Sequence, residues 1–164
     1  MDMRLGVLSD IHANLPALEA ALEALRAEGV DEVLVLGDLV GYGPHPRQVI
    51  HRVWKEGLPA IAGAWDLRVA YPFPGSLPEG VGRATLEWTR SQLGEKELAY
   101  LRALRLSHRR AYGERRLVAF HGKPGNPEAQ VDLLGEAREF LTLLERYGAE
   151  VLLLGGRHLP LARR

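Results

Sequence analysis

Four short apolar runs in this 164-residue chain each lead into a side chain that can bind a metal ion. Such runs, bounded by turn residues, are typical of buried strands. The runs and the side chains that follow them are 5–8 with Asp10 and His12, 33–36 with Asp38, 117–120 with His121, and 151–154 with His158. Parallel strands end at one edge of a sheet, where open α/β folds bind ligands. The pattern therefore predicts a metal site built from strand ends.

Helical patterns separate the first strands. Asn14 is suited to cap a helix that Gly29 ends, and leucines recur between them at 3.6-residue spacing. A second helix is predicted over 46–56, and a third parallel strand over 58–62. Alternating strands and helices predict right-handed crossovers and a mostly parallel sheet, hence an α/β fold.

The second half of the chain is predicted to begin with a long connection. A surface loop rich in Pro and Gly is expected over 67–82. The other predicted elements are helices over 83–93 and 95–104, a hairpin over 109–112 and 115–120, a helix over 131–147 and a strand over 150–154. No internal repeat or linker interrupts the pattern, so we expect a single domain over residues 1–164.

Composition limits the class of protein. The 21 basic residues balance 21 acidic ones, so no overall field favours nucleic acid or an anionic membrane. The chain has no cysteine, and any metal must be bound by His, Asp, Glu or Asn. No apolar run is long enough to span a bilayer, and we expect a cytoplasmic protein. Lysine occurs only at positions 55, 96 and 123, an arginine bias that suggests a thermophilic source.

The ordered motifs resemble the calcineurin-like metallophosphoesterases over essentially the whole chain. The matching segments are Asp10-Ile11-His12, Gly37-Asp38, Gly63-Ala64-Trp65-Asp66, His121-Gly122 and Gly155-Gly156-Arg157-His158. Residues 37–44 and 88–93 resemble stretches typical of the bacterial phosphodiesterase branch. The resemblance implies an α/β/β/α sandwich and a metal-dependent phosphodiesterase or phosphomonoesterase.

The resemblance also implies a ligand set with one complete and one depleted site. The expected ligands of the first ion are Asp10, His12, Asp38 and His158. For the second ion only Asp38 and His121 remain, because Ala64 and Gly156 stand where the family has Asn and His. One tightly bound ion is therefore expected rather than two. Ligands without sulfur suit Mn, Fe, Zn, Ni or Co.

The motif residues leave two alternatives, an active hydrolase and an inactive relative. Trp65 stands where the family has a His that contacts the scissile phosphate, and an indole transfers no proton at neutral pH. The alternative is a pseudoenzyme that binds a metal, a phosphorylated ligand or a partner without turnover. Three residues near the motifs are candidates to support the site or contact substrate: Asn14, Asp66 and Arg157.

Each of these residues also has a purely structural interpretation. Asp10 could cap the turn that follows it, His12 could be a satisfied polar residue, and Trp65 could be a core aromatic. The combination of several such residues at strand ends favours the metal site over these interpretations.

Expected partners follow from the same motifs. A phosphorylated small molecule or a phosphodiester is the expected substrate, and neither a membrane nor nucleic acid is expected. The chain stops shortly after His158, so the second sheet should lack C-terminal strands and expose an edge. An exposed edge favours pairing, and we expect a second copy of the chain to cover it.

Overall fold

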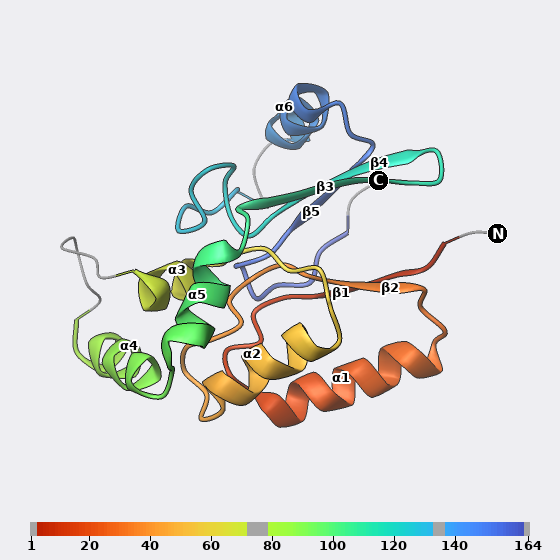
Figure 1. Ribbon diagram of the computed structural model, residues 1–164. Helices are drawn as coiled ribbons and strands as arrows, with labels where there is room; N and C mark the ends of the chain where they lie inside the picture. Colours follow the sequence, from red (N-terminus) through yellow and green to blue (C-terminus); the bar gives the residue numbers. More distant parts are fainter. Residues whose placement is uncertain (1–2, 72–78, 133–136, 163–164) are drawn as a thin grey trace.

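Two β-sheets pack face to face, with helices on the outer side of each (Figure 1). The structure, a computed structural model, describes residues 3–71, 79–132 and 137–162. Its elements are β1 (Leu5–Leu8), α1 (Leu15–Ala27), β2 (Glu32–Val35), α2 (Pro46–Lys55), α3 (Ala64–Ala70), α4 (Val81–Ser91), α5 (Glu95–Ala103), β3 (Ser107–Tyr112), β4 (Arg115–Phe120), α6 (Ala137–Tyr147) and β5 (Val151–Leu154). The predicted α/β/β/α architecture is confirmed.

The first sheet pairs β1 with β2 in parallel, from Leu5 opposite Glu32 to Leu8 opposite Val35. The predicted third strand, over 58–62, lies beside β2 but forms only isolated bridges, one of them between Val35 and Ala60. Pro59 has no N–H to donate, so it cannot extend a ladder in both directions. This segment is therefore shorter in its pairing than the sequence predicts.

The second sheet has the order β3-β4-β5, with β3 antiparallel and β5 parallel to β4. The strands that lead to His121 and His158, β4 and β5, are parallel to each other, but they lie in this second sheet and not beside β1 and β2. Both sheets nevertheless bring strand ends to one region, because they face each other across a shared apolar layer. That layer includes Leu34 and Leu36 from the first sheet and its end, and Leu117 and Ala119 from β4.

The larger core lies on the other face of the first sheet. Helices α1 and α2 cover this face in Figure 1, and α6 covers the second sheet. The predicted apolar stripe of α2 is fully buried at Val49, Ile50 and Val53. Leu18 and Leu22 of α1 are buried in the same core. The helices therefore fix the strands whose ends carry the motif residues.

The predicted loop over 67–82 is partly helical. Helix α3 continues to Ala70 and α4 begins at Val81, while 72–78 lie outside the described residues. The side chain of Asp66 accepts a hydrogen bond from Gly63 N at 2.9 Å and so starts α3, a cap that the sequence analysis missed.

The predicted helix over 131–147 also has a different start. Among described residues α6 runs from Ala137, Val131 and Asp132 are not helical, and 133–136 are not described. No helix in the described part of the chain is both long and apolar enough to cross a membrane.

Candidate metal centre

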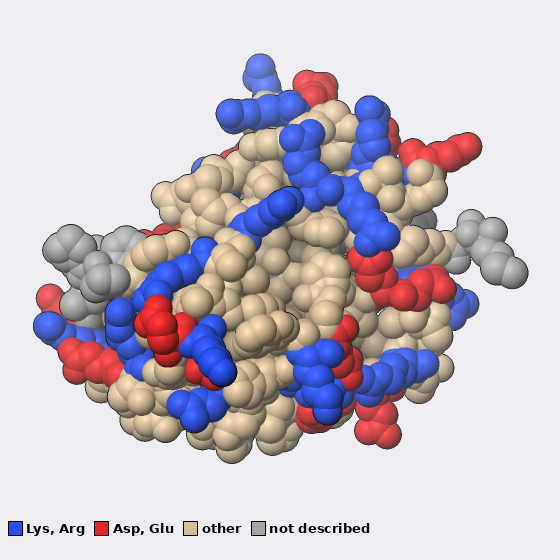
Figure 2. All heavy atoms as spheres, in the orientation of Figure 1, with Lys and Arg blue, Asp and Glu red and all other residues tan. Residues whose placement is uncertain are grey.

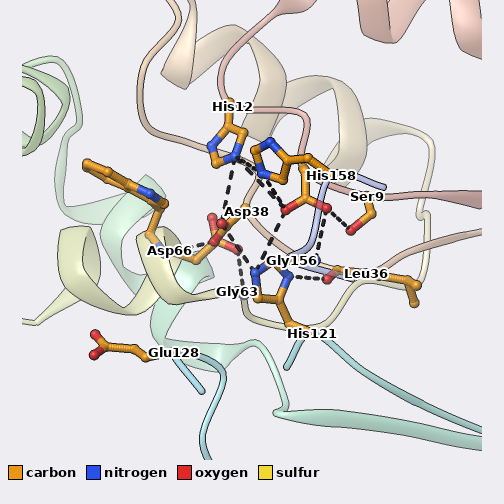
Figure 3. A network of polar contacts seen from close by, with 12 residues as sticks. Ser9, His12, Leu36, Asp38, Gly63, Asp66, His121, Glu128, Gly156 and His158 are labelled. Carbon is orange, nitrogen blue, oxygen red and sulfur yellow. Dashed lines mark hydrogen bonds and ion pairs between the residues drawn. The ribbon is translucent and has the colours of Figure 1, made fainter. Parts of the chain in front are cut away.

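Carboxylates and imidazoles from both sheets converge at one place (Figure 3). Nε2 of His158 lies 3.2 Å from Asp10 Oδ1, and it also lies 3.2 Å from Nε2 of His12. Nε2 of His121 lies 3.2 Å from Asp38 Oδ2. All five residues predicted as metal ligands are therefore brought together, and the ends of β1, β2, β4 and β5 place them there.

The backbone bends sharply to aim these side chains. Asp10, His12, Asp38 and His158 adopt positive φ angles of 57°, 48°, 52° and 54°. Such angles cost a non-glycine residue on the order of 1 kcal/mol and cluster where function requires them. Backbone hydrogen bonds hold the bends, from Asp10 N to the Gly37 carbonyl at 3.0 Å and from His12 N to the Asp38 carbonyl at 2.8 Å.

Two of the imidazoles are oriented from behind by carbonyl groups. Nδ1 of His121 donates to the Leu36 carbonyl at 2.7 Å, and Nδ1 of His12 lies 3.3 Å from the Val40 carbonyl. This leaves each Nε2 to face the carboxylates. A carbonyl on the far nitrogen is the usual partner of a metal-binding histidine.

One carboxylate oxygen of Asp10 has no hydrogen-bond partner in the described structure. Its Oδ2 accepts hydrogen bonds from Ser9 Oγ at 2.5 Å and Gly156 N at 3.0 Å. Its Oδ1 is buried with no hydrogen-bond partner, although Nε2 atoms of three histidines lie within 4.0 Å. A buried carboxylate oxygen surrounded by three imidazole nitrogens fits a divalent cation.

The geometry forms two overlapping groups that could each hold an ion. One contains Asp10, His12 and His158, and the other contains Asp10, Asp38 and His121. The residues present therefore fit the metal that the motifs predict. Asp10 belongs to both groups, whereas the sequence prediction gave only Asp38 a shared position.

Electrostatics differ between the two buried imidazoles. Burial lowers the pKa of His12 despite the nearby Asp38, which favours the neutral form that binds metals. Burial also acts to lower the pKa of His121, but the hydrogen bond and charge of Asp38 raise it to about 9. The carboxylates thus favour a positive charge beside Asp38.

Asp66 holds backbone groups beside the centre through hydrogen bonds to its carboxylate. It is fully buried, and its oxygens accept from Gly63 N at 2.9 Å and Val40 N at 3.2 Å. Burial, followed by the charge of Asp38, raises the pKa of Asp66 to about 7. Asp38 itself accepts from Trp65 N at 2.8 Å through its other oxygen. The start of α3 therefore positions Asp38.

The positions that depart from the family pattern have structural consequences. The Trp65 ring is 7% exposed, packs in the core and lies 4.6 Å from the Tyr42 ring, which fits the core interpretation. Gly156 has a φ of +79°, and a Cβ there would lie 3.0 Å from His121 Nε2. A side chain at 156 would thus enter the space beside His121.

Two further candidates contact other groups. Asn14 Oδ1 accepts from Ala17 N at 3.1 Å, which confirms its predicted role as a helix cap. Arg157 Nη2 lies 3.9 Å from Asp132 Oδ1. Neither interaction reaches the cluster of carboxylates and imidazoles.

Sequence reasoning missed Ser9 and Tyr42. Ser9 supports Asp10, and its position directly before that residue was the available signal. Tyr42 lies beside the centre with its ring 4.7 Å from that of His12, and it is 60% exposed. Tyr42 has a φ of 60° and lies within the segment 37–44, whose resemblance to the phosphodiesterase branch was the available signal.

A family model described as the calcineurin-like phosphoesterase superfamily domain matches residues 3–164. The chain belongs to this superfamily. Membership confirms the family resemblance found in the sequence, and it implies a divalent metal cofactor for a phosphoesterase of this superfamily.

The chain is also similar to individual proteins. An uncharacterised protein of Methanocaldococcus jannaschii is 26% identical over 156 residues, which cover 95% of this chain and 63% of that protein. The phosphodiesterase YfcE of Escherichia coli is 43% identical over 42 residues, which cover 26% of this chain and 23% of that protein. The chain thus spans less than two thirds of the length of the first relative.

Solved structures share the fold. A hypothetical protein from Pyrococcus horikoshii OT3 matches with a TM-score of 0.85 and 27% identity, covering 97% of this chain and 71% of its own. A metallophosphoesterase from Sphaerobacter thermophilus matches with a TM-score of 0.74 and 31% identity, covering 98% of this chain and 62% of its own.

Proposed function

We propose that this phosphoesterase hydrolyses phosphodiesters or phosphomonoesters with one tightly held divalent cation and a second, weaker one. The ligands of the tight site are Asp10, His12, Asp38 and His158. The observation that carries the proposal is the buried Oδ1 of Asp10, which has no hydrogen-bond partner among the described residues and is surrounded by Nε2 of three histidines. Relatives named as a phosphodiesterase and a metallophosphoesterase support the reaction class.

In this reaction the carboxylates of the chain bind the cations, and backbone carbonyls orient the imidazole ligands. Asp10 and Asp38 supply the negative charge that holds cations, and carbonyls of residues 36 and 40 keep His121 and His12 turned inward. A bound divalent cation supplies charge that stabilises the transition state of phosphoryl transfer. Tyr42, exposed beside His12, forms one wall against which a substrate can lie.

The second candidate is a metal-binding pseudoenzyme, and specific observations favour it. Ala64 and Gly156 lack ligand atoms, and Trp65 is packed into the core instead of reaching the centre. Loss of a general acid typically lowers a rate by about 10²–10⁴-fold. The two candidates therefore differ in whether measurable turnover remains.

Hydrolysis of bis-p-nitrophenyl phosphate and p-nitrophenyl phosphate with added Mn²⁺ separates them. Asp38→Asn is the control, because Asn accepts the Trp65 N–H and tolerates the positive φ of residue 38. Turnover that requires Mn²⁺ and disappears in Asp38→Asn supports the hydrolase. Folded, Mn²⁺-loaded protein with no turnover above that control supports the pseudoenzyme.

A further inference from the structure

We propose that the side-chain amide of Gln130 is a ligand of the second cation, taking the place of ligands that positions 64 and 156 do not supply. This inference rests on the proposed function, since it concerns the same centre. No motif contains Gln130, and its place beside the centre comes from the fold.

The amide lies where a side chain at 156 would be. A Cβ built on Gly156 would be 2.8 Å from Gln130 Nε2 and 3.0 Å from His121 Nε2. The amide and the imidazole therefore border the same small space. A side chain at 156 and the Gln130 amide could not both occupy it, so the glycine makes room for the glutamine.

The amide also has an unused bonding group. Oε1 of Gln130 is buried and has no hydrogen-bond partner among the described residues. Leaving such a group unsatisfied costs about 1–3 kcal/mol, so a partner is expected. Nε2 is the amide atom that borders the space beside His121. A half-turn of the terminal amide exchanges nitrogen and oxygen, so that the oxygen faces this space and a cation there becomes its partner.

The backbone before Gln130 is held firmly against His121. Lys123 N donates to the Ala129 carbonyl at 2.7 Å, closing a turn over 123–129. A Cβ on Gly122 would lie 2.4 Å from the Ala129 oxygen, so the turn packs tightly on the residue that follows His121. A site gains precision when rigid backbone places its side chains.

The chemistry suits a second, weaker ion. Asp10, Asp38 and His121 form a group with ligand atoms close enough for one cation. An amide oxygen is a ligand that divalent cations accept, as in many calcium and manganese sites. Being uncharged, it attracts the ion less than a carboxylate would, so the second ion should bind more weakly than the first.

Mn²⁺ binding tests the assignment. Calorimetric titration and metal counting by mass spectrometry are applied to the wild-type protein, Gln130→Leu, Gln130→Glu and the matched control Gln48→Leu, an exposed glutamine on α2. We expect two ions in the wild type. Gln130→Leu should raise the Kd of the weaker ion about tenfold or more and leave the tighter ion unchanged. Gln130→Glu should tighten the weaker ion, and Gln48→Leu should match the wild type.

The outcomes are distinguishable from failure of the proposed function. A weaker ion that binds Gln130→Leu and wild type equally overturns the inference, as does a wild type that binds one ion only. Reduced affinity for inorganic phosphate with unchanged Mn²⁺ binding assigns the amide to substrate and also overturns it. A folded wild type that binds no Mn²⁺ overturns both the inference and the proposed function. Thermal melting of each variant verifies folding.

Discussion

At the scale of single residues, Asp10 has two roles in the candidate metal centre. Its Oδ2 accepts hydrogen bonds from Ser9 and Gly156, while its Oδ1 faces the imidazoles. One oxygen therefore has a structural role and the other is available as a ligand. Asp10, His12 and Asp38 were predictable because each follows an apolar run within a few positions. Gln130 was not, since neighbours distant in sequence place it beside the centre. Ser9 was missed although it directly precedes Asp10, because its hydroxyl supports the carboxylate and is not itself a predicted ligand.

Asp10→Asn should remove cation binding while the protein stays folded. Asn tolerates the φ of 57° at this position and is the same size, so the turn should persist. Losing the charge of a residue that belongs to both candidate groups should raise the Kd for the tighter Mn²⁺ by at least about 100-fold, measured by calorimetry. Binding like that of the wild type would show that Asp10 is not a ligand.

At the scale of elements, apolar runs predicted the strands but not their sheets. The run 117–120 pairs with the hairpin partner β3 and with β5, because the apolar layer between the sheets divides the strands in a way that no local pattern encodes. The start of α3 was missed for a different reason. Its capping signal, Gly63 to Asp66, overlaps the motif that was interpreted only as chemistry.

Gly63→Ala should disturb both α3 and the centre. A Cβ at 63 would lie 2.2 Å from Asp38 Oδ1, so the carboxylate must move. Gly94→Ala is the matched control, because Gly94 caps α5 with nearly the same dihedral angles and its Cβ would meet only Glu97 Oε2 at 3.0 Å. Denaturant unfolding should show Gly63→Ala less stable than the control by about 1–3 kcal/mol. Equal losses would contradict the close packing against Asp38.

Glu97 should make the α5 region sensitive to acid. Burial acts to raise its pKa, but hydrogen bonds from His51 and Gly94 N outweigh this and hold the pKa below the ordinary value. Stability from a lowered carboxyl pKa is present above the unfolded pKa and is lost as pH falls through the folded one. The wild type should therefore lose more unfolding free energy than Glu97→Gln between about pH 5 and 3. Parallel pH profiles would contradict this.

At the scale of the whole molecule, acidic and basic residues are equal in number, and an apolar groove lies along one strand. Basic side chains over β3 and β4 lie close to acidic ones in Figure 2, and Arg110 and Arg116 pair with Glu32 and Glu150. These pairs agree with the expectation that nucleic acid is not a partner, which stays a prediction. On another side, a groove of about 1270 Å³ runs along β5 and is lined by apolar residues that include Val7, Leu152 and Leu161.

We expect a second copy of the chain to cover this groove. Within the described residues β5 has a ladder partner only in β4, and zero net charge leaves no overall repulsion between copies. Sedimentation should show an average mass that rises with concentration. Leu161→Asp, in the groove, should weaken this rise, whereas Leu106→Asp, away from it, should not. A wild type that is monomeric at every concentration would remove the prediction.

The hydrogen bond from Gly156 N to Asp10 Oδ2 joins the segment that follows β5 to the segment that follows β1. Beyond it, the carboxylates come from the first sheet and two of the imidazoles from the second, so neither half holds a complete set of ligands. A cation bound there would stabilise the packing of the two sheets, because separating the sheets would also release the ion. Each tenfold increase in free ion above its Kd should then add about 1.4 kcal/mol to the free energy of unfolding.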